Sequence, residues 1–316
     1  MASSGYQVEL ISIDEKHALF EKYKGRVLYE EKADIYGCCI KLLTNLKSVK
    51  ERWGENFFAM SATIRSHGRL LVTEEEGEGS RVLYDPLSKT AFLLNVGYYG
   101  WVKSIALSVA GDVLEDEHGI FSVHGACLDM GGKGFCLMGA GGAGKTTNAY
   151  GLLRLTNMRV VSDDWFFVRL YGDDALAFGS EKNFYIRADL ATVWEEFKWV
   201  VDKAEFDQDG RAIVDIRWII GKGRIVPLTT LKNVFFLRRE PGDKTACQEL
   251  SAEEAVDYLE AKGYFNPHLL VRNERKAKLR RSFFSELFKR TSVYFVNTAQ
   301  PPSQTQELLK NMLAKA

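Results

Sequence analysis

The sequence predicts an α/β protein built around a phosphate-binding loop in a mixed β-sheet. A glycine-rich loop at 139–146 stands between an apolar strand pattern at 134–138 and a helical pattern at 148–155. A second strand pattern precedes this strand across the tight turn 131–134, so the two strands should pair antiparallel. The first third of the chain carries separate strand and helix patterns without a chemical motif. We therefore expect a mixed-sheet core preceded by a smaller α+β domain.

The boundary between the two domains is predicted near residue 115. Residues 1–115 would form the α+β domain, with substrate binding as one option for its role, and residues 116–316 the domain that carries the loop. In the first domain the patterns predict strands at 6–12 and 67–73, a hairpin of 81–84 with 90–96, and helices at 36–53 and 98–115. In the second they predict strands at 119–130, 134–138, 158–161, 211–218, 233–239 and 292–298, with helices at 148–155, 251–261, 267–289 and a last one capped by Ser303 and Gln306.

Composition and charge exclude several classes of protein. The 42 basic and 42 acidic residues balance, which gives no support to a nucleic-acid-binding or membrane-surface protein. No apolar run approaches the roughly 20 residues that a membrane-spanning helix needs. Residues 1–6 show no secretory signal pattern, and the five cysteines match no zinc module. We therefore expect a cytoplasmic protein.

The loop Gly139-Ala-Gly-Gly-Ala-Gly-Lys-Thr has the full spacing of a phosphate-binding loop. Glycines let several backbone N–H groups point at one anion, and the following helix turns its positive end toward it. Lys145 would neutralise the β- and γ-phosphates, and the Thr146 hydroxyl would ligate Mg²⁺. The predicted cofactors are ATP and Mg²⁺, held by Gly139, Ala140, Gly141, Gly142, Ala143, Gly144, Lys145, Thr146 and Thr147.

Two adjacent carboxylates, Asp163 and Asp164, follow the apolar strand pattern that ends at Val161. Phosphoryl-transfer enzymes place a metal-binding carboxylate or a base at such a position. Asp163 is the candidate metal ligand, and Asp164 is the candidate base for an acceptor hydroxyl. Side chains of neighbouring residues on an extended chain point in opposite directions, which is why the two roles are divided.

The segment from His124 to Arg187 resembles the catalytic domain of the HPr kinase/phosphorylase family, which is related in fold to phosphoenolpyruvate carboxykinases. The resemblance rests on Ser-Val-His124-Gly-Ala, on the 139–146 loop about twenty residues later, and on Val-Val-Ser-Asp163-Asp164. It implies that His124 assists phosphoryl transfer and that Glu181 contacts the metal. It also implies a homo-oligomer.

The sequence departs from the family at several points. Ala140 stands where the family carries Asp, and the helix after the loop begins Thr146-Thr147-Asn148. The family's late arginine-containing segment is missing, and its nearest counterpart is Gly221-Lys-Gly-Arg224. The charge on the transferred group could therefore be stabilised by Arg187 or by Arg224, and these departures weaken the case for HPr itself as the substrate.

The sequence is compatible with three functions. The leading prediction is an ATP-dependent kinase acting on an alcohol, with a serine of a protein or peptide as acceptor. The second is a small-molecule kinase for free serine or a related alcohol. The third is a nucleotide-sensing module that transfers nothing, and the presence of His124, Asp163 and Asp164 argues against it.

Overall fold

The computed structural model describes residues 6–77, 79–207 and 210–315, so the first five residues of the predicted non-secretory N-terminus lie outside it. The chain divides into two compact units, 1–122 with 267–277 and 123–266 with 278–316. The sequence predicts a single boundary between the two domains, whereas in the structure residues 267–277 also belong to the first unit. Both large sheets combine parallel and antiparallel pairing, which confirms the predicted α/β class with a mixed sheet.

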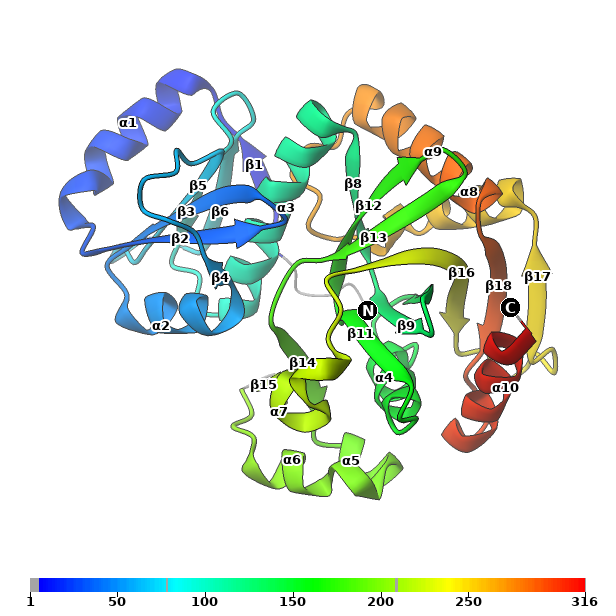
Figure 1. The fold of residues 1–316 in the computed structure, drawn as a ribbon. Coiled ribbons are helices and arrows are strands. Elements are labelled where there is room, and N and C mark those ends of the chain that lie inside the picture. Colours follow the sequence, from blue (N-terminus) through cyan, green and yellow to red (C-terminus); the bar gives the residue numbers. More distant parts are fainter. Residues whose placement is uncertain (1–5, 78, 208–209, 316) are drawn as a thin grey trace. The chain divides into compact units, whose positions relative to one another are not determined.

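The first unit is built on a seven-stranded sheet with the order β1-β6-β7-β5-β3-β2-β4 (Figure 1). Helix α3 packs on β3, β5 and β7. A Cβ on Gly68 would lie 2.4 Å from Val109 of α3, so that face of β5 needs a glycine. Leu71, on the other face of β5, packs with the residues that flank and form α1. The elements are β1 Val8–Leu10, α1 Ile13–Tyr23, β2 Tyr29–Ile35, β3 Cys38–Thr44, α2 Lys47–Asn56, β4 Phe58–Ala59, β5 Gly68–Thr73, β6 Arg81–Asp85, β7 Thr90–Leu94 and α3 Tyr99–His118.

The helix predicted at 36–53 is wrong for its first half, which forms strand β3. Six of the seven residues of β3 are buried, because helices cover both faces of this central strand. A short continuous apolar run has no period that separates a buried strand from a buried helix, and the neighbouring strands decide it. The strand at 67–73, the 81–94 hairpin and the helix at 98–115 are confirmed.

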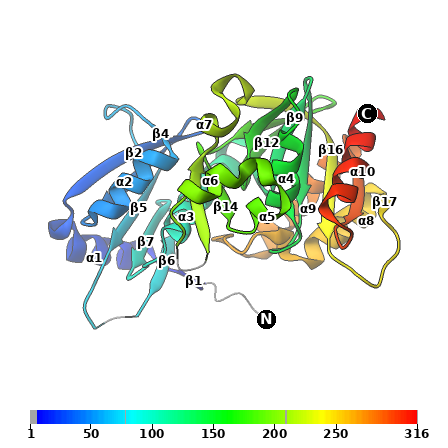
Figure 2. The same ribbon diagram turned by 90° about the horizontal axis from the view of Figure 1, so that it is seen from below.

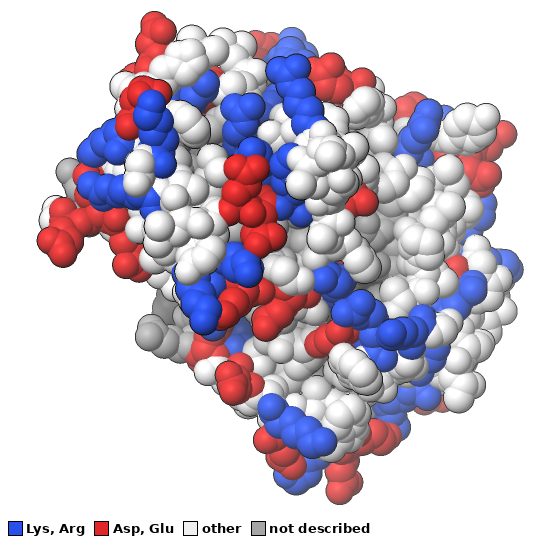
Figure 3. Space-filling view, turned by 60° about the vertical axis from the view of Figure 1, so that its left-hand side comes forward, with Lys and Arg blue, Asp and Glu red and all other residues white. Residues whose placement is uncertain are grey.

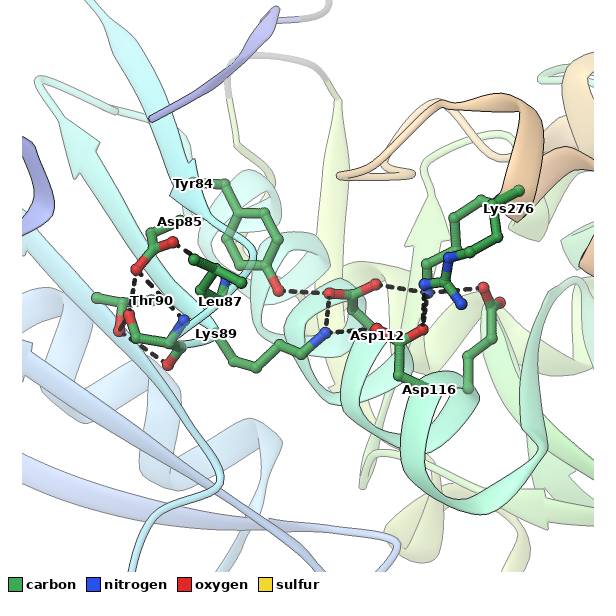
Figure 4. A network of polar contacts seen from close by, with 11 residues as sticks. Tyr84, Asp85, Leu87, Lys89, Thr90, Asp112, Asp116 and Lys276 are labelled. Carbon is green, nitrogen blue, oxygen red and sulfur yellow. Dashed lines mark hydrogen bonds and ion pairs between the residues drawn. The ribbon is translucent and has the colours of Figure 1, made fainter. Parts of the chain in front are cut away.

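A buried network of charges holds segment 267–277 on α3 (Figure 4). Lys276 Nζ lies 2.8 Å from Asp112 Oδ1, 2.9 Å from Glu115 Oε1 and 2.9 Å from Asp116 Oδ1. Lys89 Nζ donates to Asp112 Oδ2 at 2.7 Å and to Asp116 Oδ2 at 2.6 Å. Burial raises the pKa of Asp112 and Asp116, but these ammonium groups outweigh burial and lower both values. Burial lowers the Lys276 pKa, and the carboxylates outweigh it and raise the value.

The second unit contains a nine-stranded sheet with the order β11-β9-β10-β16-β13-β12-β8, and β18 and β17 continue from β16. Helices α4 and α10 pack together, and α4 also contacts β9, β10 and β11 (Figure 1). The ring of Phe236 on β16 packs against Tyr258 of α8, Phe288 of α9 and Phe295 of β18. The elements are β8 Ile120–His124, β9 Ala126–Met130, β10 Lys133–Met138, α4 Lys145–Leu153, β11 Met158–Ser162, β12 Trp165–Tyr171, β13 Asp174–Gly179, β16 Leu228–Arg238, β17 Cys247–Leu250, α8 Ala252–Ala261, α9 Glu274–Lys289, β18 Ser292–Asn297 and α10 Pro302–Lys315.

Between β13 and β16 the chain forms a separate two-stranded sheet with short helices around it (Figure 2). Its elements are β14 Asn183–Arg187, α5 Leu190–Val193, α6 Lys198–Lys203, β15 Arg211–Asp215 and α7 Ile216–Ile220. The described ranges contain no helix that combines the length and apolar character needed to cross a bilayer. On the face drawn in Figure 3, basic and acidic side chains are interspersed, as the balanced charge leads one to expect.

Four predicted elements of the second unit are corrected. The strand predicted at 211–218 ends at Asp215, and the chain continues as helix α7. The strand predicted at 119–130 is two strands separated at Gly125, where a Cβ would lie 2.6 Å from the Leu137 carbonyl oxygen. The helix predicted at 267–289 begins only at Glu274, because the Asn273 side chain accepts from the Lys276 amide and caps it. Ser303 does not cap the last helix, which already starts at Pro302. The antiparallel β9–β10 pair and the capped helix at 251–261 are confirmed.

Candidate active site

The 139–146 loop connects β10 to α4 and needs glycine at two positions for different reasons. A Cβ on Gly139 would lie 2.6 Å from the Leu237 carbonyl oxygen of the adjacent strand β16. Gly144, which caps α4, has φ 92°, a left-handed conformation that costs other residues energy. Ala140, Gly141 and Gly142 form the exposed apex of the loop. The backbone is thus held at both ends and open at its tip.

Side chains from distant parts of the chain anchor this loop. The Thr298 hydroxyl, after β18, donates to the Ala143 carbonyl oxygen at 2.9 Å. Asn148 Nδ2 donates to the Gly144 carbonyl at 2.9 Å, and Gln306 Nε2 donates to Asn148 Oδ1 at 3.0 Å. No local pattern in the sequence connects Thr298 with Ala143 or Gln306 with Asn148, which lie 155 and 158 positions apart.

Lys145 folds back over the loop. Its Nζ donates to the Gly139 carbonyl oxygen at 2.7 Å and to that of Ala140 at 3.3 Å. Burial lowers the Lys145 pKa, while the charges of Asp164 and Asp163 oppose that effect. The lysine therefore lies within electrostatic reach of both carboxylates. Thr146 and Thr147 follow on the first turn of α4, half-buried.

Side-chain hydrogen bonds hold the Asp163–Asp164 turn between β11 and β12 in place. The hydroxyls of Ser162 and Ser180 both donate to the Trp165 carbonyl oxygen, the second at 2.6 Å. Asp163 is buried, and its Oδ2 accepts from the Tyr185 amide of β14 at 3.0 Å. Asp164 instead turns to β8, with Oδ1 3.0 Å from His124 Nε2. The two carboxylates thus contact different strands, as expected for adjacent residues whose side chains point in different directions.

His124 stands between two oxygen atoms. Its Nδ1 lies 2.6 Å from the Phe265 carbonyl oxygen, and its Nε2 lies 3.0 Å from Asp164 Oδ1. A carbonyl oxygen can only accept, so Nδ1 carries a proton. The Nε2 contact then needs a second proton, held either on Nε2 or on the carboxylate. The imidazole ring also stacks on Trp165 at 5.6 Å. One proton therefore lies between His124 Nε2 and Asp164 Oδ1, and the contact of Nδ1 with the Phe265 carbonyl fixes the direction of the ring.

A left-handed turn delivers the Phe265 carbonyl to this histidine. Gly263, Tyr264 and Phe265 have φ values of 57°, 57° and 51°. A side-chain-bearing residue in this conformation costs about 1–2 kcal/mol, so the turn carries strain at Tyr264 and Phe265. Strain of this kind persists where the surrounding fold requires it, and functional sites are where it concentrates.

The remaining predicted residues divide into two groups. Glu181 is buried just ahead of β14, the strand whose Tyr185 amide contacts Asp163, and Arg187 is exposed at the end of that strand. Arg224 lies elsewhere. Its guanidinium donates to three carbonyl oxygens at the end of α4 and just beyond it, away from the loop, and burial lowers its pKa. This position gives Arg224 the role of a helix clamp and leaves Arg187 as the candidate arginine.

The residues fit the predicted cofactors. Mg²⁺ in nucleotide sites is usually held by one or two protein oxygens together with phosphates and water. Thr146 at the start of α4 and the buried Asp163 carboxylate could supply these protein oxygens. Within the described ranges no group of three or more His, Cys, Asp or Glu side chains forms a separate metal centre. The exposed loop apex leaves its amides open to an anion.

No protein-family model and no curated protein matches this sequence. Among solved structures, the chain is similar to the Hpr(Ser) kinase/phosphatase from Coxiella burnetii. The similarity covers 61% of this chain and 97% of that chain, with 11% sequence identity and a TM-score of 0.35. At this identity and TM-score it carries no argument about the activity of this chain.

Proposed function

We propose that this chain is an ATP- and Mg²⁺-dependent phosphotransferase that transfers the γ-phosphate to a hydroxyl group, with a serine of a protein or peptide as acceptor. The observation that supports this most is the contact of His124 Nε2 with Asp164 Oδ1, near the lysine of a glycine-rich loop. A loop that only senses a nucleotide has no use for a base held in place by a histidine.

Each residue has one task in the proposed reaction. The loop amides and Lys145 bind the donor phosphates, and Thr146 and Asp163 hold the metal. When bound, Mg²⁺–ATP supplies the phosphoryl group and neutralises part of its charge. Asp164 takes the proton of the acceptor hydroxyl as the new oxygen–phosphorus bond forms and the β,γ-bridging bond breaks. Late proton removal is enough, because the transition state of phosphoryl transfer is loose.

His124 orients this base. Its Nδ1–H is anchored on the Phe265 carbonyl, so Nε2 stays directed at Asp164 Oδ1. Positioning of this kind is the main contribution that a protein makes to phosphoryl transfer. Glu181, buried just ahead of β14, would contact the metal together with Asp163.

The test is transfer of label from γ-labelled ATP by the wild type and Lys145→Ala. We expect a folded Lys145→Ala protein that loses roughly 10³-fold in rate, the order expected when a key charge stabiliser is removed. Near-normal turnover by this variant would refute the phosphate-loop assignment. Binding of ATP by the wild type without any transfer to protein, peptide or water would instead favour the nucleotide-sensing module.

The acceptor class is tested in the same assay. Labelling of proteins in an extract that excess free serine does not suppress supports a protein or peptide acceptor. Labelling of free serine in a purified mixture, with no protein labelled, supports the small-molecule kinase.

A further inference from the structure

Two arginines face each other across the β14–β15 hairpin. The pairing register places Arg187 directly opposite Arg211, and cross-strand partners project from the same face of a sheet. Both residues are exposed. The hairpin therefore carries two basic residues side by side on one face.

The hairpin brings this pair to the site described above. The Tyr185 amide donates to Asp163 Oδ2 at 3.0 Å, and Arg187 is two residues further along the same strand. Two residues of strand span about 7 Å, a distance that an arginine side chain can cover. Within the described ranges, the Arg187 side chain makes no hydrogen bond or ion pair. Its guanidinium is therefore available to a ligand.

Arg211 reaches the same place from the other strand. The pairing register sets it directly beside Arg187, on the same face of the hairpin. The Asp207 side chain accepts from the Arg211 backbone amide at 2.9 Å, which fixes the start of β15. Positive charge therefore approaches the site from the loop and from both strands of the hairpin.

We infer that Arg187 and Arg211 form a two-pronged anion site for the phosphoryl group in transfer, opposite the phosphate loop. This inference rests on the proposed function and adds Arg211 to its catalytic residues. Guanidinium groups match phosphate oxygens in a planar, bidentate manner that an ammonium group cannot reproduce. The loop holds the phosphates that stay with the nucleotide, and the arginine pair neutralises the group that leaves it.

The experiment compares Arg187→Gln and Arg211→Gln with the wild type in the full chain. The matched control is Arg169→Gln, which removes another exposed strand arginine, on β12, opposite Leu176. Affinities for ATP and ADP and the single-turnover rate are measured for each protein. We expect both variants to bind ADP like the wild type, to bind ATP more weakly, and to transfer roughly 10²–10³-fold more slowly. Arg169→Gln should match the wild type throughout.

A second readout separates this role from a structural one. Inorganic phosphate should raise the melting temperature of the wild type and of Arg169→Gln, and this increase should be lost in Arg187→Gln and Arg211→Gln. Without phosphate, the two site variants should melt close to the wild type, because both side chains are exposed and surface substitutions usually change stability little.

Three results would overturn the inference. If both arginine variants transfer like the wild type while Lys145→Ala is inactive, the arginine pair takes no part in the transfer, and the proposed kinase function still stands. An unchanged ATP affinity with a raised KM for the acceptor would mean that the pair binds an anionic acceptor instead. Full activity of Lys145→Ala would remove the proposed function itself.

Discussion

The role of the contact between His124 and Asp164 can be tested by two substitutions, each of which keeps one of the two hydrogen bonds of the imidazole ring. Asparagine carries its amide near the position of Nδ1, so His124→Asn can still donate to the Phe265 carbonyl but cannot reach Asp164. Glutamine carries its amide near the position of Nε2, so His124→Gln keeps the donor to Asp164 and loses its anchor. Neither amide can exchange a proton.

The expected magnitude follows from the bond that is lost. A hydrogen bond to a charged group contributes about 1.5–3 kcal/mol, and His124→Asn removes one such bond at 3.0 Å from the proposed base. Because each ~1.4 kcal/mol corresponds to a factor of ten, the transfer rate should fall roughly 10- to 150-fold if the bond acts in the transition state. Affinity for Mg²⁺–ATP should stay unchanged, since neither the loop nor Asp163 is altered.

The assay is single-turnover transfer from γ-labelled ATP, with ATP affinity and melting temperature measured on the same samples. His118→Asn is the control, because His118 is exposed at the end of α3 in the first unit. His124→Gln should lose rate as well, because its anchor on the left-handed turn is gone. A folded His124→Asn that transfers within twofold of the wild type would refute the assignment of His124 as the orienting residue.

Three further predictions concern charge. Asp164→Asn should leave ATP–Mg²⁺ affinity intact and cut single-turnover transfer ~10²–10⁴-fold, whereas Asp163→Asn should weaken ATP–Mg²⁺ binding itself; the opposite pattern would reverse the two roles. Arg224→Met should lower the unfolding free energy by about 2–4 kcal/mol in urea titrations, because three carbonyls around the end of α4 lose their donor, with the transfer rate per folded molecule unchanged. Lys276→Met should cost about 3–5 kcal/mol at neutral pH, since buried carboxylates keep their charge without their partner. The network's two aspartates have pKa values lowered from 3.8 and its lysine a value raised from 10.5, so its contribution in the wild type is complete between these pH values, and is lost as pH falls through the lowered values or rises through the raised one. The deficit of the variant should shrink toward pH 4, because protonation relieves the uncompensated charge; a deficit independent of pH would refute this account.

Elements set by contiguous residues could be predicted from the sequence. The capped helix at 252–261 follows from Ser251 and Glu254, which form the reciprocal bonds of a capping box. The loop at 139–146 and the antiparallel strands before it follow from glycine spacing and apolar runs. In these segments the local conformational preference and the final environment agree, so a short window contains the necessary information.

Elements decided by burial could not be predicted in the same way. The strand at 38–44 and the late start of α9 at Glu274 depend on what covers them and on where segment 267–273 is held. A continuous apolar run is equally compatible with a strand and a helix, and the residues of segment 267–273 do not specify where the helix after them begins. The packing of distant elements then selects one conformation.

The sequence by itself determined which chemical groups this protein carries: a glycine-rich loop with its lysine, two adjacent aspartates and a histidine ahead of them. Only the tertiary structure decided how these groups are arranged. The Phe265 carbonyl that orients His124 lies 141 positions away in sequence, and Arg224 clamps α4 through residues 66 to 71 positions away. The register of β14 on β15 opposes Arg187 and Arg211. Such contacts depend on how strands and turns are brought together in three dimensions, and no local pattern of residue types specifies that.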